Sequence, residues 1–204
     1  MKLFKFFALS LILSNSANAY ISITESGELI PRGHYQVGLE PQLLTNHGGG
    51  INMNVFLDNG ISDAMSARIE LGGGAVDFNA FASVKWIPIP DFENQPAMGL
   101  RIGGGLARDE SENLLHAQVA PMVSKKYGTS LGLANPYLAV PFTIVNTQGQ
   151  STVGTNLTIG SEFHYEKWHA ATLGAEWSLD LNKSYSYISA FVAFPFESHK
   201  GFGR

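Results

Sequence analysis

The feature that most constrains the fold of this chain is a series of about ten segments in which every second residue is apolar. The segment Met65–Ala75 reads MSARIELGGGA, with apolar residues on one parity and polar residues or glycine on the other. Because successive side chains of a β-strand point to opposite faces, this period indicates strands whose two faces meet different surroundings. No convincing helical pattern appears after the N-terminal residues, so the sequence predicts an all-β fold.

The alternating segments are roughly ten residues long, about twice the mean strand of soluble proteins. They are His34–Thr45, Ile51–Asp58, Met65–Ala75, Ala80–Ile89, Met98–Ala107, Leu114–Lys125, Pro136–Thr147, Ser151–Tyr165, Trp168–Leu181 and Tyr185–Phe196. Strands of about nine to eleven residues cross a bilayer when tilted. An open sheet of this size leaves two bare edges, so we expect a closed antiparallel barrel with short loops.

The predicted barrel has about ten strands, an even number that suits outer-membrane barrels. Ala80–Ile89 is short and ends among prolines, and the glycines Gly72–Gly74 blur the end of the segment before it. Eight strands therefore remain an alternative. The dipeptide Asn59-Gly60 and the charged stretch Arg108–Asn113 are interpreted as connections, as is Lys126–Asn135.

The N-terminus has the pattern of an export signal. Lys2 and Lys5 precede the short apolar run Phe6–Leu13, and an A-x-A site follows. The residues at the predicted cleavage site are Ala17, Ala19 and Tyr20. The alternative, a membrane-anchoring helix, needs roughly 20 apolar residues, and this run is shorter. We expect residues 1–19 to be a signal peptide and residues 20–204 to be one barrel domain.

The composition narrows the class of partner. The chain has no cysteine, which excludes disulfides and thiolate chemistry, and only 15% of its residues are charged, against about 25% in a typical soluble domain. Its net charge is −4, and removal of the signal would remove two lysines and no acids. An acidic chain of this kind argues against a nucleic-acid partner.

The last alternating segment, Tyr185–Phe196, resembles the C-terminal assembly signal of bacterial outer-membrane β-barrels. The residues that carry this resemblance are Ile188, Val192, Phe194 and Phe196. In that family the closing Phe is usually the last residue, whereas here Glu197–Arg204 follows it.

The whole mature chain resembles small bacterial outer-membrane β-barrels of the OmpA/OmpX/OmpW-like kind. The resemblance implies export to the outer membrane of a Gram-negative bacterium, with outer-membrane lipid, periplasmic chaperones and the barrel-assembly machinery as partners. It implies no cofactor. In such a barrel the apolar parity faces lipid and the polar parity faces the lumen.

Charged residues fall on the polar parity of several segments, and we expect them to form a network in the lumen. They are Glu40, Arg68, Glu70, Lys85, Arg101, Glu162, Glu176 and Asp180. Buried charges must be paired or hydrated, so interstrand ion pairs are expected. The network is compatible with a polar plug that stabilises a structural barrel and with a narrow pore for small ions or solutes. Residues 20–32 lack a clear pattern and are interpreted as a periplasmic lead-in.

No motif specifies catalysis or metal binding. His116 lies near Ser111 and the acids of the same predicted loop, which leaves a lipid-modifying outer-membrane enzyme as an alternative. His164 and His169 do not have a recognised ligand spacing, so no metal site is predicted. A second alternative is a secreted soluble barrel that binds an apolar ligand inside, as lipocalins do.

Overall fold

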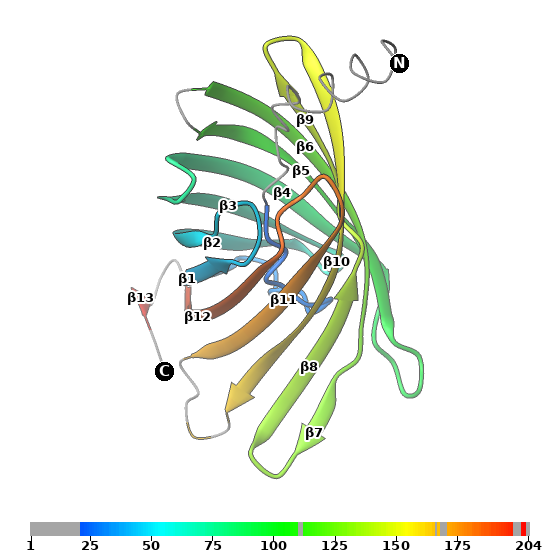
Figure 1. Cartoon of the computed structure of the whole chain (residues 1–204). Coiled ribbons are helices and arrows are strands. Elements are labelled where there is room, and N and C mark those ends of the chain that lie inside the picture. The colour runs from blue at the N-terminus through cyan, green and yellow to red at the C-terminus, as the bar shows by residue number, and fades with distance from the viewer. Residues whose placement is uncertain (1–20, 110–111, 166, 168–170, 198–200, 203–204) are drawn as a thin grey trace, which may run out of the picture.

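The protein folds into a closed antiparallel β-barrel, described here from a computed structural model that covers residues 21–109, 112–165, 167, 171–197 and 201–202 (Figure 1). The predicted signal peptide and Tyr20 lie outside the described residues. The strands are β1 (His34–Leu44), β2 (Gly50–Ser62), β3 (Met65–Gly74), β4 (Phe78–Ile89), β5 (Ala97–Asp109), β6 (Glu112–Ser124), β7 (Tyr127–Thr129), β8 (Gly132–Ala139), β9 (Phe142–Thr147), β10 (Gln150–Tyr165), β11 (Thr172–Asn182), β12 (Tyr187–Glu197) and β13 (Gly201–Phe202). Across the described residues, no helix is long and apolar enough to cross a membrane.

The barrel has ten strands around its circumference, which confirms the all-β closed barrel and the larger of the two predicted strand counts. Each strand pairs with the next in chain order, and pairing of β1 with β12 closes the ring. β8 and β9 share one register against β10 and therefore form one barrel strand. Two short segments extend the ring: β7 prolongs the pairing of β6 with β8, and β13 pairs with the end of β12.

The gap between β8 and β9 falls at Pro141, which has no N–H to donate to the ladder. Backbone hydrogen bonds continue on either side of it. The Val140 N–H donates to Pro121 O at 3.0 Å, and the Asn156 N–H donates to Pro141 O at 3.1 Å. The proline interrupts the hydrogen-bond pattern and leaves the path of the strand intact.

Alternation along each strand separates an apolar outer surface from the lumen. Outward residues include Ile69, Leu71, Ile102 and Leu115, all more than half exposed. Arg68 and Glu70, which alternate with Ile69 and Leu71 on β3, are buried. A soluble β-barrel places its apolar residues inside and its polar residues toward water. This barrel has the opposite arrangement.

Three predicted connections are strand instead. Asn59-Gly60 lies within β2, and the turn comes later, between Ser62 and Met65. Gly60 allows a close backbone approach, since a Cβ there would lie 2.2 Å from Pro31 O. The stretch Arg108–Asn113 belongs largely to β5 and β6, and Lys126–Asn135 contains the β7–β8 hairpin.

Residues 21–26 run inside the barrel, where Figure 1 shows them in blue within the ring of strands. Ser22, Ile23, Thr24 and Ser26 have no exposed surface. The prediction of a periplasmic lead-in was therefore wrong for residues 21–26. The segment lacks a strand pattern because its neighbours are lumen side chains from many strands rather than one partner strand.

The two ends of the lumen differ. At the end that carries the β1–β2 and β9–β10 turns, inward apolar side chains pack together; they are Leu44, Val76, Ala107, Leu114, Val145 and Tyr187. At the opposite end, near the start of β1, a cavity of about 740 Å³ opens among residues that include Glu28, Lys85 and His164. We call this cavity the vestibule.

Candidate functional site

The candidate site is the lumen together with residues 21–28, which we call the N-terminal segment. Two wall carboxylates hold its backbone. Glu176 accepts hydrogen bonds from the N–H groups of Ile23 (3.1 Å) and Thr24 (2.7 Å), one on each oxygen. Glu162 accepts from the N–H (2.8 Å) and hydroxyl (2.6 Å) of Ser26. Charge-assisted bonds of this kind are the stronger class of protein hydrogen bond, so both residues anchor the segment to the wall.

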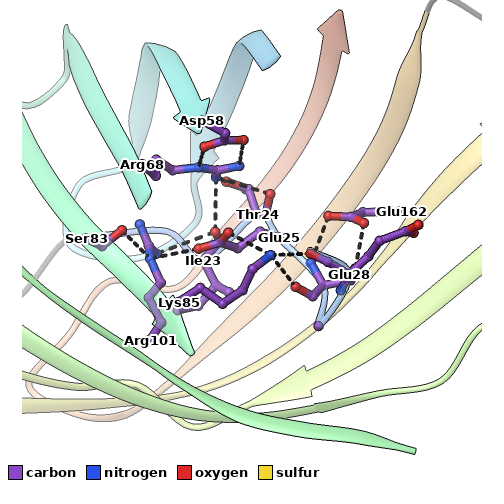
Figure 2. A network of polar contacts seen from close by, with 12 residues as sticks. Ile23, Thr24, Glu25, Glu28, Asp58, Arg68, Ser83, Lys85, Arg101 and Glu162 are labelled. Atoms are coloured by element: carbon purple, nitrogen blue, oxygen red, sulfur yellow. Dashed lines mark hydrogen bonds and ion pairs between the residues drawn. The ribbon is translucent and has the colours of Figure 1, made fainter. Parts of the chain in front are cut away.

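Three wall cations hold the carbonyl side of the same segment, as Figure 2 shows. Arg101 Nη1 donates to Ser22 O at 2.5 Å, and Lys85 Nζ donates to Ser26 O at 2.8 Å and Glu28 O at 2.7 Å. Arg68 Nη1 donates to the Thr24 hydroxyl at 3.0 Å. Within the described part of the chain the segment pairs with no strand, and these side chains satisfy backbone groups that burial would otherwise leave unpaired.

Glu25 at the centre of the segment supplies a counter-charge for two of these bases. Its carboxylate lies 3.0 Å from Lys85 Nζ and 3.1 Å from Arg101 Nε. All three side chains are almost completely buried. One acid, which belongs to the N-terminal segment and not to the barrel wall, therefore forms ion pairs with both bases.

The third base, Arg68, is neutralised from the wall. Asp58 on the neighbouring strand β2 accepts two parallel bonds from it, at 2.6 and 2.8 Å. The guanidinium also stacks over the Phe56 ring, 4.0 Å from its centroid. Arg68 is thereby fixed both in the wall and against the segment.

The structure places seven of the eight predicted lumen charges in one buried region; these are Glu40, Arg68, Glu70, Lys85, Arg101, Glu162 and Glu176. Asp180 stands apart, half-buried near the opposite rim, with its carboxylate 3.7 Å from His47 Nε2. Sequence reasoning missed Asp58 and Glu25. Asp58 shares the polar parity of β2 and was available from the pattern, whereas Glu25 lies in a segment without a pattern.

Acids outnumber bases in this region. The buried acids are Glu25, Glu40, Asp58, Glu70, Glu162 and Glu176, against three buried bases. Glu40 accepts from the hydroxyls of Ser22 and Thr24, both at 3.2 Å. Among the described residues, neither carboxylate oxygen of Glu70 has a hydrogen-bond partner. The lumen therefore has an acidic character that ion pairs only partly offset.

The wall of the vestibule carries a second polar group, formed by Glu28, Glu162 and His164. His164 Nε2 lies 3.2 Å from Glu28 Oε2, and Lys126 Nζ lies 2.6 Å from Glu28 Oε1. Partial burial raises the pKa of the Glu28 carboxyl, but its contacts with His164 and Lys126 outweigh this and hold that pKa at about 2. Glu28 is therefore a carboxylate at any physiological pH.

The structure also describes the surroundings of His116, the residue at the centre of the enzyme hypothesis. Its side chain is buried in the lumen, and its ring meets the Phe81 ring edge-on at 5.5 Å between centroids. The adjoining cavity, which Asp109 also lines, measures about 10 Å³, which is room for about one water molecule. Of the loop residues in the enzyme hypothesis, Glu110 and Ser111 lie outside the described residues, as does His169.

The four residues of the predicted assembly signal lie in β12 at the closing seam. Val192 and Phe194 oppose Leu39 and Val37 of β1, and Ile188 and Phe194 are about half exposed on the outer surface. Phe196 stacks on Tyr35 across the seam, with ring centroids 5.4 Å apart. The residues after Phe196 include β13, in which Phe202 pairs back with Phe196.

Comparison with known proteins gives matches in structure alone, since no family model and no curated protein sequence matches the chain. The translocator domain of the autotransporter NalP from Neisseria meningitidis superposes with a TM-score of 0.51 at 12% identity, over 97% of this chain and 95% of that one. The chain has the fold of an outer-membrane β-barrel.

Two further outer-membrane proteins match this barrel less closely. An outer membrane channel from Pseudomonas putida F1 gives a TM-score of 0.49 at 10% identity, over 87% of this chain and 100% of that one. The N-terminal β-barrel domain of Pseudomonas aeruginosa OprF gives 0.36 at 10% identity, over 81% and 98%. The assignment of the fold rests on the closed ring of strands and on the first comparison.

Proposed function

We propose that the protein is an integral outer-membrane β-barrel of a Gram-negative bacterium whose lumen is closed by its own N-terminal segment. It acts as a structural barrel rather than as an open pore. The apolar outer surface supports insertion into lipid, because side chains such as Ile69 and Leu115 are more than half exposed on it. Most of the long strands have ten to sixteen residues, enough to cross a bilayer at a tilt.

The observation that carries the proposal is the burial of residues 21–26 among the charges of the lumen. Arg68, Lys85 and Arg101 all bind this segment or its Glu25, so the groups that would line a pore are already occupied. The apolar cluster around Tyr187 narrows the same path toward the other rim. To cross the barrel, ions would have to displace both the N-terminal segment and this apolar cluster.

Planar-bilayer recording on the refolded mature protein tests this proposal. We expect many insertions without steady current. A variant that lacks residues 21–26 should conduct, with a preference for cations because acids outnumber bases in the emptied lumen. Deletion of residues 201–204, which removes the short strand β13 paired with the end of β12, is the matched control and should show no current.

The shift in gel mobility on heating, which reports a closed barrel, must be present in each variant before recording. Steady current through the unaltered protein would contradict closure and favour the narrow pore. Release of the protein from membranes by carbonate or urea would instead favour the soluble barrel and overturn the membrane assignment.

A further inference from the structure

We propose that the vestibule binds a divalent transition-metal ion, for which Zn²⁺ is the probe, through Glu28, Glu162 and His164. One possible ligand atom from each residue lies within 4.8 Å of those from the other two. Glu162 and His164 are two residues apart on β10 and so face the lumen together, while Glu28 comes from the N-terminal segment. The site therefore joins the segment to the barrel wall.

The imidazole of His164 is oriented as a ligand would be. Its Nδ1 lies 3.1 Å from the Thr172 hydroxyl on β11, which fixes the ring and leaves Nε2 facing the two carboxylates. The His164 Nε2 atom is shielded from solvent and lies 3.2 Å from Glu28 Oε2, without the geometry of a hydrogen bond. Metal-binding histidines commonly have their second ring nitrogen held in this way.

The two carboxylates are also held in place while keeping acceptor capacity. Ser26 binds both oxygens of Glu162. Glu28 contacts Lys126 through Oε1, and its Oε2 accepts from Asn135 Nδ2 at 3.3 Å and faces His164. Neighbouring ligands of a tetrahedral ion with bonds near 2.0 Å lie about 3.3 Å apart. Glu28 and His164 already have this separation, and Glu162 lies within 4.8 Å of both, so a shift of its carboxylate toward them would complete the set of ligands.

The ligand set selects the class of ion. One imidazole with two carboxylates suits zinc and its transition-metal neighbours better than calcium or magnesium, which prefer oxygen alone. The vestibule provides an entry path and room for water in the remaining coordination positions. Lys126 offsets part of the negative charge and should limit the affinity without abolishing it.

Isothermal titration of the full refolded barrel with Zn²⁺ tests the proposal. We expect one ion per chain, and His164→Ala should weaken binding tenfold or more because it removes the only nitrogen ligand. His34→Ala is the matched control: His34 lines the same vestibule and lies 3.6 Å from Glu197, but it is not in the proposed site. The affinity of the His34→Ala variant for Zn²⁺ should be unchanged.

A second variant and a second readout keep the test independent of folding defects. Thr172→Val removes only the partner of Nδ1 and should also weaken Zn²⁺ binding. The X-ray absorption spectrum of the zinc-loaded barrel should contain one imidazole. Absence of zinc binding, equal binding by His164→Ala, or equal losses in His34→Ala would each overturn the site. Because binding is measured without conductance, failure here leaves the proposed closure of the lumen unaffected.

Discussion

At the scale of single residues, Glu25 supplies the negative charge that stabilises two buried bases. It contacts both Lys85 and Arg101, and the wall offers them no ion pair of comparable length among the described residues. Glu25→Gln keeps the shape and removes the charge. Removing one partner of a buried ion pair typically costs about 3–5 kcal/mol. We expect a loss of this size in the free energy of unfolding, measured by urea titration in detergent.

Glu93→Gln is the control for that substitution, because Glu93 lies exposed in the turn between β4 and β5. It should change the unfolding free energy by less than about 0.5 kcal/mol. Equal stability of the two variants would show that water or Glu70 compensates the bases when Glu25 is neutral.

The inward orientation of single charged residues was the feature most predictable from the sequence. The parity of Arg68, Lys85 and Arg101 follows from strand alternation alone and needs no knowledge of the partner strands. Their ion-pair partners do not follow from it, because pairing depends on the register between strands and on a segment outside the barrel wall. Asp58 requires the β2–β3 register, and Glu25 requires the path of a chain with no periodicity.

At the scale of the strand, inward glycines match inward aromatic rings on the neighbouring strand. Gly38 pairs with Phe56 and Gly174 with Phe191, and a Cβ on either glycine would lie 2.1 Å from that ring. Such glycines thus make room for aromatic side chains, which narrow the lumen further. An aromatic ring over a glycine of the adjacent strand also fixes register, since a shift of one residue would separate them.

Gly174→Ala tests this pairing. The added methyl group overlaps the Phe191 ring, and overpacking of this kind costs about 1–3 kcal/mol. We expect a lower urea midpoint, restored in part when Phe191→Leu is added. Gly128→Ala, where a Cβ meets nothing within 4 Å, should leave the midpoint unchanged. An unchanged midpoint in Gly174→Ala would mean that the ring moves freely.

The closing strand carries a prediction about assembly. Phe196→Ala removes the ring that stacks on Tyr35 across the β1–β12 seam, whereas deletion of residues 198–204 leaves that contact in place. We expect the substitution to reduce the folded, membrane-inserted fraction more than the deletion does. Heat-modifiable bands in the membrane fraction measure this directly. The reverse result would place the assembly signal in the tail.

At the scale of the whole molecule, closure of the barrel was predictable because it follows from many weak local signals that agree. Strand after strand repeats the same alternation, and unpaired edges exclude an open sheet. The filling of the lumen was not predictable in the same way. Residues 21–26 gain their conformation from contacts with residues more than 40 positions away, such as Arg68 and Glu176, which no local window contains.

The outer surface provides the last prediction, which concerns the solvent around the whole barrel. Ile69 lies in the middle of β3, opposite Leu57 and Ala82, and is more than half exposed. If lipid surrounds it, Ile69→Arg should destabilise the barrel by about 2–4 kcal/mol, because a charge then enters the hydrocarbon.

The control is Ile61→Arg, one residue from the end of β2, which should cost about 0–1 kcal/mol because charges near the interface are tolerated. Both free energies are measured by denaturant titration in phospholipid vesicles. Replacing an exposed isoleucine by arginine in water changes the free energy of unfolding little. Small and equal effects at the two positions would therefore mean that the apolar surface does not face lipid. A cost that falls from Ile69 to Ile61 would instead locate the centre of the bilayer along β2 and β3.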